Sequence, residues 1–393
     1  MFKNGTLKLC YIGSRTKNSF KLLSVQTSNV VPNKNASSHK DVGANNEEDV
    51  LIKDFGNTGI ITLNRPKALN SLNLSMIEKI YPTLKKWEIS KKLVVIEGVG
   101  EKAFCAGGDI KAIALAADEN KELRETFFRK EYIQNHLIGT YIIPYVALMN
   151  GITMGGGVGL SVHGKYRVAT EKTLFAMPET AIGLFPDVGG SYFLPRLQGR
   201  LGVYLGLTGE RLKGIDVLHA GIATHIVPSE NLSQLKQDLL TSEFPDVTTV
   251  LNKYQLKNLD KQFALAPYMK QIERCFSASS VEEIIKRLEE DKSEWAEKTI
   301  QTLLKMSPTS LKVALLAMKK GSTLNLAECL KMEYRLACNL TICKTTDFYE
   351  GVRAVVIDKD QNPKWKPKDL SDVSDAYVNK QFENFPQEKD LLL

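Results

Sequence analysis

The sequence predicts a protein of the α/β class, and two observations on its pattern support this. Between Val50 and about Val227, short apolar runs rich in β-branched residues end at Asn, Gly or Pro, which is typical of buried strands. Amphipathic stretches of helical length separate these runs. Strands that alternate with helices in this way indicate a layered α/β architecture.

The two patterns place individual elements in this region. Strands are expected at Ile60–Leu63, Leu93–Ile96 and Tyr145–Met149, and helices at Leu74–Trp87 and Glu122–Leu137. After Pro228 the pattern becomes mainly helical. We therefore expect three parts, which are a leading segment at residues 1–45, a core with the functional site at 46–230, and a helical C-terminal region with a tail at 231–393.

Two helices of the C-terminal region have recognisable ends. Ser280 to Glu283 has the form of a capping box at the start of one helix. Ser307-Pro308 starts another helix, which Gly321 should stop. The tail from Lys364 is polar and interrupted by prolines, so we expect it to wrap around the surface.

The composition is that of a soluble globular protein with a large core. Hydrophobic residues make up 43% of the 393 positions and charged residues 25%, and no run of 18 apolar residues is present, so no membrane partner is expected. The formal net charge of +7 comes from the first 40 residues, which hold seven of the 52 basic residues and no acid. The remainder is formally neutral, which argues against a nucleic-acid partner.

The leading segment has the composition of a targeting sequence. Residues 1–40 are basic, free of acids and rich in Ser, Thr and Asn, as in organellar transit peptides. The apolar run Leu7–Ile12 is too short, and too interrupted by Lys8, for a secretory signal. Mitochondrial import is thus predicted, with cleavage before Val50. A disordered N-terminus without a targeting role is the alternative.

Neither a metal nor another cofactor is expected. The six cysteines include no C-x-x-C pair, and the five histidines form no H-E-x-x-H or comparable ligand set. Free thiols in a reducing compartment are the simplest interpretation of the cysteines.

Two glycine-rich segments, Phe104–Lys111 (FCAGGDIK) and Asn150–Gly159 (NGITMGGGVG), each follow an apolar run and precede a helix-forming stretch. Glycine lets a ligand approach the backbone, and free N–H groups at a helix start point outward. Two such groups that converge on one point form an oxyanion hole. Close helix packing is one alternative. A phosphate-binding loop is another, but Tyr166 stands where that loop requires Ser or Thr.

A third segment, Phe175–Gly190 (FAMPETAIGLFPDVGG), carries two carboxylates in apolar surroundings. Poor solvation raises the pKa of an acid such as Glu179 or Asp187 and suits it to proton transfer or nucleophilic attack. For either acid alone, a helix N-cap is the alternative interpretation.

With these three segments, the chain resembles the crotonase (enoyl-CoA hydratase/isomerase) superfamily. The resemblance extends from about Val50 to Trp365 and includes further motifs at Asn64–Asn70, Met306–Ser310 and Asp347–Ala354. It implies a crotonase-like spiral of ββα units with a helical C-terminal region, and a small-molecule acyl-CoA substrate. Its members often form trimers or paired trimers, so the resemblance allows an oligomer. Alternatively, the helical C-terminus folds back over its own site.

The resemblance also implies roles for single residues. The N–H groups of Gly108 and Gly156 would form the oxyanion hole, and Glu131 would line the acyl pocket. Lys111 and the segment Arg65–Asn70 would lie near the CoA moiety.

Two departures from the hydratase pattern favour hydrolysis. Hydratases use two glutamates, of which one survives as Glu179 while the other position is Gly159, so half of the acid/base pair is missing. Asp187 stands where typical hydratases have glycine, as in the 3-hydroxyisobutyryl-CoA hydrolase branch. Similarity to that branch implies hydrolysis of the thioester of 3-hydroxyisobutyryl-CoA, a step of valine breakdown, in the mitochondrial matrix. It also allows 3-hydroxypropanoyl-CoA as a second substrate.

The residues leave the mechanism open. Glu179 would either attack the thioester carbonyl or activate water, and Asp187 would hold the substrate hydroxyl or steer water and the proton of the leaving thiolate. A hydratase or isomerase of the same fold remains an alternative, as does a non-catalytic acyl-CoA-binding or ribosome-associated scaffold.

Overall fold

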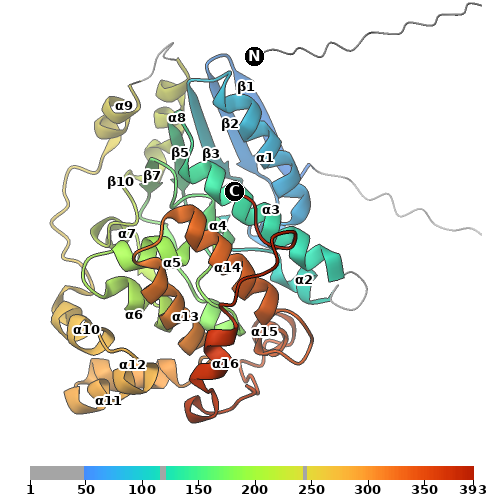
Figure 1. Cartoon of the computed structure of the whole chain (residues 1–393). Coiled ribbons are helices and arrows are strands. Elements are labelled where there is room, and N and C mark those ends of the chain that lie inside the picture. Colours follow the sequence, from blue (N-terminus) through green and yellow to red (C-terminus); the bar gives the residue numbers. More distant parts are fainter. Residues whose placement is uncertain (1–47, 116–120, 242–245) are drawn as a thin grey trace, which may run out of the picture. The chain divides into compact units, whose positions relative to one another are not determined.

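The strands form two β-sheets, and the strands of the first sheet are labelled in Figure 1. The structure is a computed structural model that describes residues 48–115, 121–241 and 246–393, and the expected targeting segment lies outside these residues. The first sheet has the strand order β1 (Val50–Phe55), β2 (Thr58–Leu63), β3 (Leu93–Gly98), β5 (Tyr145–Met149), β7 (Tyr166–Ala169) and β10 (His225–Ile226). The second has the order β4 (Ala103–Cys105), β6 (Ile152–Met154), β8 (Leu174–Ala176) and β9 (Leu212–Lys213).

From β3 to β8, consecutive strands alternate between the two sheets. Strands β3, β5 and β7 are parallel neighbours in the first sheet, and the strands that follow them in the chain, β4, β6 and β8, are parallel neighbours in the second. A helical segment follows each such pair. This repeat of two strands and a helix confirms the predicted spiral of ββα units, and the three predicted strands lie within β2, β3 and β5.

The central strands of the first sheet are buried on both faces. Ile61 and Ile96 belong to the main apolar cluster, whereas their neighbours Ile60 and Val95 belong to a second cluster on the opposite face. Helices α8 (Leu232–Thr241) and α9 (Val247–Tyr254) supply the side chains that cover the second cluster. Burial on both faces explains why these strands read as continuous β-branched runs.

The helices of the first half include both that were predicted. Helix α1 (Leu74–Glu88) begins at Asn73, whose side chain accepts a hydrogen bond from the Met76 N–H. Helix α3 spans Lys121–Gly139. The shorter helices are α2 (Ile110–Leu115), α4 (Gly156–Gly159), α5 (Gly190–Phe193), α6 (Leu201–Thr208) and α7 (Ile215–His219).

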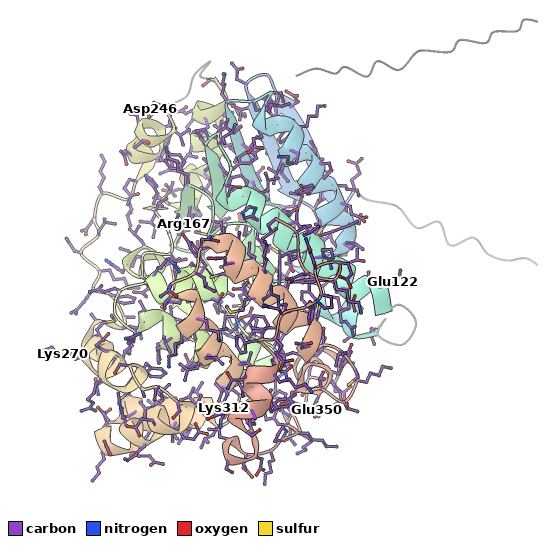
Figure 2. All side chains as sticks on the ribbon, viewed as in Figure 1. Glu122, Arg167, Asp246, Lys270, Lys312 and Glu350 are labelled. Atoms are coloured by element: carbon purple, nitrogen blue, oxygen red, sulfur yellow. The ribbon has the colours of Figure 1, made fainter. Side chains whose placement is uncertain are left out.

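The C-terminal region is helical, as predicted. Its remaining helices are α10 (Met269–Phe276), α11 (Val281–Asp291), α12 (Glu294–Leu303), α13 (Pro308–Gly321), α14 (Leu326–Leu340), α15 (Asp347–Val352) and α16 (Asp375–Lys380). Residues from Glu47 onward form one compact unit, in which α13 packs on α5 and α14 packs on α3. Lys312 of α13, labelled in Figure 2, donates a hydrogen bond to the Val373 carbonyl and so holds the chain that leads to α16. No helix among the described residues is long and apolar enough to cross a membrane.

Two predicted helix ends differ in detail. Ser280 caps α11 by accepting from the Glu283 N–H, but the Glu283 side chain accepts from Arg287, one turn on, so only half of the predicted capping box forms. Gly321 is itself the last residue of α13 and does not lie just after its end. The helical hydrogen bonds continue one residue further, because the Ser322 N–H donates to the Met318 carbonyl.

The tail returns across the two long helices. Arg129 of α3 donates to the carbonyls of Lys389 and Asp390, at 2.7 and 2.6 Å. Arg335 of α14 forms an ion pair with the Asp390 carboxylate. The polar tail therefore wraps around the surface, as its composition predicts.

Candidate active site

The three segments singled out in the sequence meet at one edge of the second sheet. Gly107 and Gly108 follow β4, Gly155 and Gly156 follow β6, and Glu179 follows β8. These strands are parallel neighbours in the order β4-β6-β8, so their carboxyl ends lie side by side. Ligand sites of α/β sheets form at this edge.

The second glycine segment contains a strand that the sequence did not reveal. The run Tyr145–Met149 was expected to lead directly into the glycines, but Gly151, at φ +93°, turns the chain into β6 of the second sheet. Only then does the chain reach Gly155 and the start of α4. With just three residues, β6 is too short to give a periodic signal.

The two glycine turns are packed against each other. A Cβ atom on Gly156 would lie 3.1 Å from the Gly108 nitrogen and 2.7 Å from Glu131 Oε1. Gly107 and Gly155 adopt φ values of +116° and +44°, which disfavour residues with a side chain. Glycine is therefore required by close approach at Gly156 and by conformation at the other two positions.

The backbone hydrogen bonds around these turns leave two donors free. Leu72 donates to the Gly107 carbonyl and accepts from the Asp109 N–H, both at 2.8 Å. Within the described part of the chain, the N–H groups of Gly108 and Gly156 have no acceptor. Two unused amides on adjacent turns can stabilise the negative charge that develops on a carbonyl oxygen.

Glu179 lies beside this pair of turns. Its Oε1 would be 2.9 Å from a Cβ atom on Gly155, and its Oε2 has no hydrogen-bond partner among the described residues. The residue is 5% exposed. Burial raises the pKa of Glu179 well above its usual range, and the nearby Asp187 carboxylate raises it further. It is the first residue of the 3₁₀ turn Glu179–Ile182 rather than an N-cap.

The C-terminal motifs hold this 3₁₀ turn in place. Ser307 donates its N–H to the Thr180 carbonyl at 3.1 Å and its hydroxyl to Asp347 Oδ2 at 2.7 Å. At the end of the turn, Gly183 has a φ of +72°, and a Cβ atom there would overlap with the Asp347 backbone. Residues more than 120 positions away in the chain thus position Glu179.

Among the described residues, one side chain forms a hydrogen bond with the Asp187 carboxylate. The Tyr132 hydroxyl of α3 donates to Asp187 Oδ2 at 2.6 Å. The carboxylate is 5% exposed, and burial raises its pKa to about 6, while the Tyr132 hydrogen bond acts in the opposite direction. Gly189 occupies the N-cap position of α5, so Asp187 is not the helix cap that its sequence context allowed.

Two further side chains, one partly and one fully buried, hold the turn that follows Asp187. Val188 has a φ of +49°, and His163 Nε2 donates to its carbonyl at 2.7 Å. Glu333 of α14 accepts from the N–H groups of Gly189 and Ser191, at 2.7 and 2.9 Å, and from the Ser191 hydroxyl at 2.5 Å. The C-terminal region therefore folds back onto the site of its own chain.

Glu333 was not found by sequence reasoning. It lies between the buried residues Met332 and Tyr334, and burial raises its pKa to about 8. An acid inside the apolar stripe of a helix is the signal that could have identified it, because buried carboxylates are rare unless they have partners.

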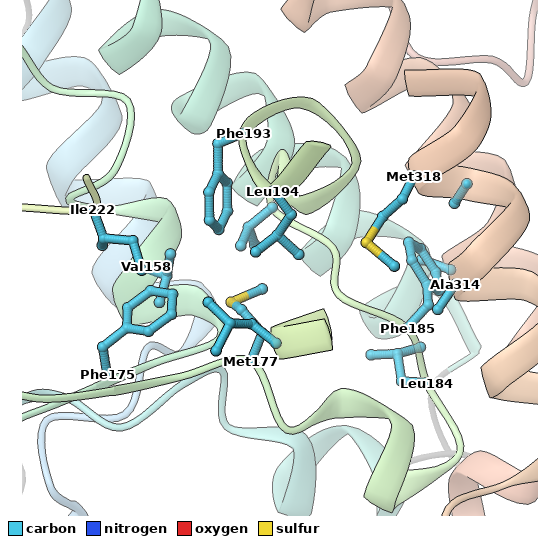
Figure 3. Close-up of a cluster of buried hydrophobic side chains, with 14 of the residues drawn as sticks. Val158, Phe175, Met177, Leu184, Phe185, Phe193, Leu194, Ile222, Ala314 and Met318 are labelled. Carbon is cyan, nitrogen blue, oxygen red and sulfur yellow. The ribbon is translucent and has the colours of Figure 1, made fainter. Parts of the chain in front are cut away.

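Glu131 completes a group of three buried acids. Its Oε1 has no hydrogen-bond partner in the described chain, and its pKa is raised well above the usual range by burial and then by the charges of Asp187 and Glu179. Met177 and Phe185, each two residues before one of the other two acids in the sequence, belong to the main apolar cluster (Figure 3). Carboxylates in such surroundings lose hydration, which accounts for the shifts.

The residues predicted near CoA lie at the rim of the β4 turn. Arg65 forms an ion pair with Asp109 at 2.9 Å and donates to the Ser71 carbonyl at 2.6 Å. Asn70 is buried and donates to the carbonyls of Val99 and Ala103, which gives it a structural role in this turn. Lys111 lies on α2 and is exposed.

Gly159 shows why a second glutamate is absent. A Cβ atom there would lie 2.7 Å from Asn135 Nδ2 and 2.8 Å from Val188 Cβ. The space that a glutamate at this position would need is therefore occupied by α3 and by the turn after Asp187.

Comparisons with known proteins identify close relatives. Residues 58–382 match the enoyl-CoA hydratase/isomerase family. The mitochondrial 3-hydroxyisobutyryl-CoA hydrolase of Danio rerio is 57% identical over 355 residues, which is 88% of this chain and 92% of that protein. The protein of the same name from Homo sapiens is 53% identical over 377 residues, or 93% and 95% of the two chains.

Two solved structures share the fold over their full length. A carnitinyl-CoA dehydratase from Mycobacterium thermoresistibile has a TM-score of 0.82 at 36% identity, over 88% of this chain and 99% of that one. An enoyl-CoA hydratase from Rhodobacter sphaeroides 2.4.1 has a TM-score of 0.80 at 35% identity, over 88% and 100%. The chain therefore belongs to the enoyl-CoA hydratase/isomerase (crotonase) family and groups, within it, with the 3-hydroxyisobutyryl-CoA hydrolases.

Proposed function

We propose that this enzyme hydrolyses the thioester of 3-hydroxyisobutyryl-CoA to 3-hydroxyisobutyrate and CoA, a step of valine breakdown. The observation that carries the proposal is the pair of buried acids, Glu179 and Asp187, next to two unused amides, with no room for a second glutamate at Gly159. The names of the relatives, which are 51–58% identical, support the same substrate.

The thioester carbonyl is proposed to lie between the N–H groups of Gly108 and Gly156. These amides would stabilise the oxyanion of the tetrahedral intermediate, and losing one such donor typically slows a reaction ~10²–10³-fold. Glu131 packs against Gly156 and is proposed to line the acyl pocket.

Glu179 is proposed to supply the attack, by one of two routes. In the first, its carboxylate bonds to the carbonyl carbon while the C–S bond breaks and the thiolate takes a proton, and water then cleaves the anhydride. In the second, it removes a proton from water while the water oxygen bonds to the carbonyl carbon, the C–S bond then breaks, and the thiolate takes a proton. Hydroxylamine added during turnover converts an anhydride at position 179 into a hydroxamate, which mass spectrometry distinguishes from unmodified glutamate.

Asp187 is proposed to position the substrate hydroxyl and to take part in proton transfer to the leaving thiolate. Its pKa of about 6 lies near neutrality, where a carboxyl group exchanges protons most effectively. Lys111 and the Arg65–Asn70 segment are proposed to contact the CoA moiety from the rim.

We propose the mitochondrial matrix as the location. The relatives are named as mitochondrial proteins, and residues 1–40 are basic and free of acids. Fusion of residues 1–45 to a fluorescent protein should direct it into the matrix, and a fusion that stays in the cytosol would remove this proposal.

The reaction is tested by thiol release from 3-hydroxyisobutyryl-CoA and by hydration of crotonyl-CoA. Rapid thiol release with little hydration is expected, whereas the reverse would support a hydratase.

Glu179→Gln should leave binding of the CoA ester largely intact and lower kcat by about 10²–10⁴-fold, because a carboxamide neither attacks nor accepts a proton. Glu328→Gln, at an exposed acid of α14, is the matched control and should retain activity. Full activity of Glu179→Gln would remove this carboxylate from the mechanism.

A further inference from the structure

Asn135 of α3 is a buried amide whose polar atoms are unused. Its exposure is 0%, and neither Oδ1 nor Nδ2 has a hydrogen-bond partner among the described residues. A buried amide without hydrogen-bond partners destabilises the folded protein. Such a group in a functional region calls for a ligand that completes its hydrogen bonds.

The amide lies along the proposed acyl pocket. Glu131 Oε1 and Asn135 Nδ2 each come within 2.7 Å of the Cβ position of a glycine in α4, the first at Gly156 and the second at Gly159. Asn135 is thus about one helical turn, roughly 5 Å, beyond the proposed oxyanion hole. Val188, the neighbour of Asp187, lies against the same spot on Gly159.

The Asn135 amide is suited to bind a hydroxyl group that lies about one helical turn from the oxyanion hole. Three bonds of about 1.5 Å separate the carbonyl carbon of the acyl group from the oxygen of a hydroxyl on C3, so this hydroxyl extends about 4 Å from a carbonyl held in the hole. A hydroxyl is both a donor and an acceptor, and Asn135 offers one acceptor and a donor amide.

We propose that Asn135 binds the C3 hydroxyl of the acyl group and gives the enzyme its preference for 3-hydroxyacyl thioesters. This inference rests on the proposed function. A thioester without the hydroxyl leaves the buried amide unpaired, and sites built to bind a hydroxyl discriminate strongly against analogues that lack it.

Gln134 provides a matched control on the same helix. It is also fully buried, with both amide atoms unpaired among the described residues. At 100° per residue, Asn135 lies on the side of Glu131 that faces Tyr132, and Gln134 lies on the other side. Because Tyr132 contacts Asp187, the proposed hydroxyl position lies on the Tyr132 side of the helix, and Gln134 is on the opposite side of Glu131.

The test compares kcat/KM for 3-hydroxyisobutyryl-CoA and isobutyryl-CoA in the full-length enzyme. Wild type should prefer the hydroxylated ester, and Asn135→Leu should reduce this preference about 10–100-fold, mainly through the hydroxylated ester. Gln134→Leu should keep the wild-type preference. If leucine prevents folding, Asn135→Ala removes the amide without adding bulk and should show the same loss.

Two outcomes separate the possible failures. If a folded Asn135 variant keeps the wild-type preference, or loses activity equally on both esters, Asn135 does not read the hydroxyl and the inference is wrong. If wild type releases thiol from neither ester, the proposed function is wrong, and this inference falls with it.

Discussion

Asp187 shows how one hydroxyl group tunes a buried acid. Burial favours the neutral carboxyl group, while the hydrogen bond from Tyr132 stabilises the ionised form. The balance leaves its pKa at about 6, so both protonation states are populated near neutrality. Tyr132 is therefore a positioning residue for Asp187.

Tyr132→Phe should move the pH dependence of hydrolysis. Without the donated hydrogen bond the pKa of Asp187 rises. The alkaline limb of the kcat profile, which Asp187 would control as the proton donor to the thiolate, should then shift upward by about one pH unit. Tyr145→Phe is the matched control, since the buried Tyr145 hydroxyl donates to the Leu160 carbonyl, at 2.9 Å, and not to an acid of the site. It should lower stability without moving the profile. An unshifted profile in Tyr132→Phe would show that Asp187 does not control this limb.

At the scale of elements, the sequence predicts the strands and turns that carry the site better than it predicts the residues that hold the two acids in place. The strands β2, β3 and β5 are predictable because burial on both faces makes them β-branched runs. The glycine turns and the two acids are predictable because a strained or poorly solvated position admits few residue types. Strands β4 and β6 have three residues each, too few for a pattern, and they are defined by pairing with distant segments.

The supports of the two acids could not be predicted for the same reason. Glu333 lies 146 positions after Asp187 in the chain, and Ser307 and Asp347 are similarly remote from Glu179. Their roles depend on how the C-terminal helices fold back. Family motifs marked Ser307 and Asp347 as significant, but local sequence does not tell which turn they hold.

Gly183→Ala should test the support of the 3₁₀ turn that carries Glu179. Alanine at a φ of +72° costs about 1–2 kcal/mol, and its Cβ would also overlap with the Asp347 backbone, so the turn must move. A shift of about 1 Å at a catalytic group can lower the rate ~10²-fold. We expect a clear loss of kcat in thiol release together with a loss of stability in urea unfolding.

Gly221→Ala is the matched control for this prediction. Gly221 has a φ of +78° and nothing within 4 Å of its Cβ position, so alanine there should lower stability by about 1 kcal/mol and leave kcat unchanged. If both variants lose stability equally and keep full kcat, contact with the Asp347 backbone does not position Glu179.

At the scale of the whole molecule, the buried acids oppose stability as the pH rises. Glu131, Glu179, Asp187 and Glu333 all have raised pKa values, and burial is the largest cause for each. The folded state therefore holds protons that the unfolded state has already released above about pH 4.5. Stability must fall with pH wherever the folded state binds more protons.

The fall should extend from about pH 4.5 to about pH 8. Asp187 loses its proton near pH 6 and Glu333 near pH 8, and the shift of Asp187 from 3.8 to about 6 alone corresponds to about 3 kcal/mol. The melting temperature should thus decrease by several degrees between pH 5.5 and pH 8 in thermal unfolding. Glu179→Gln removes one of these acids and should show a shallower decrease and a higher melting temperature at pH 8. A melting temperature that rises over this range, or an equal slope in the variant, would mean that burial of these acids does not destabilise the folded protein as their raised pKa values predict.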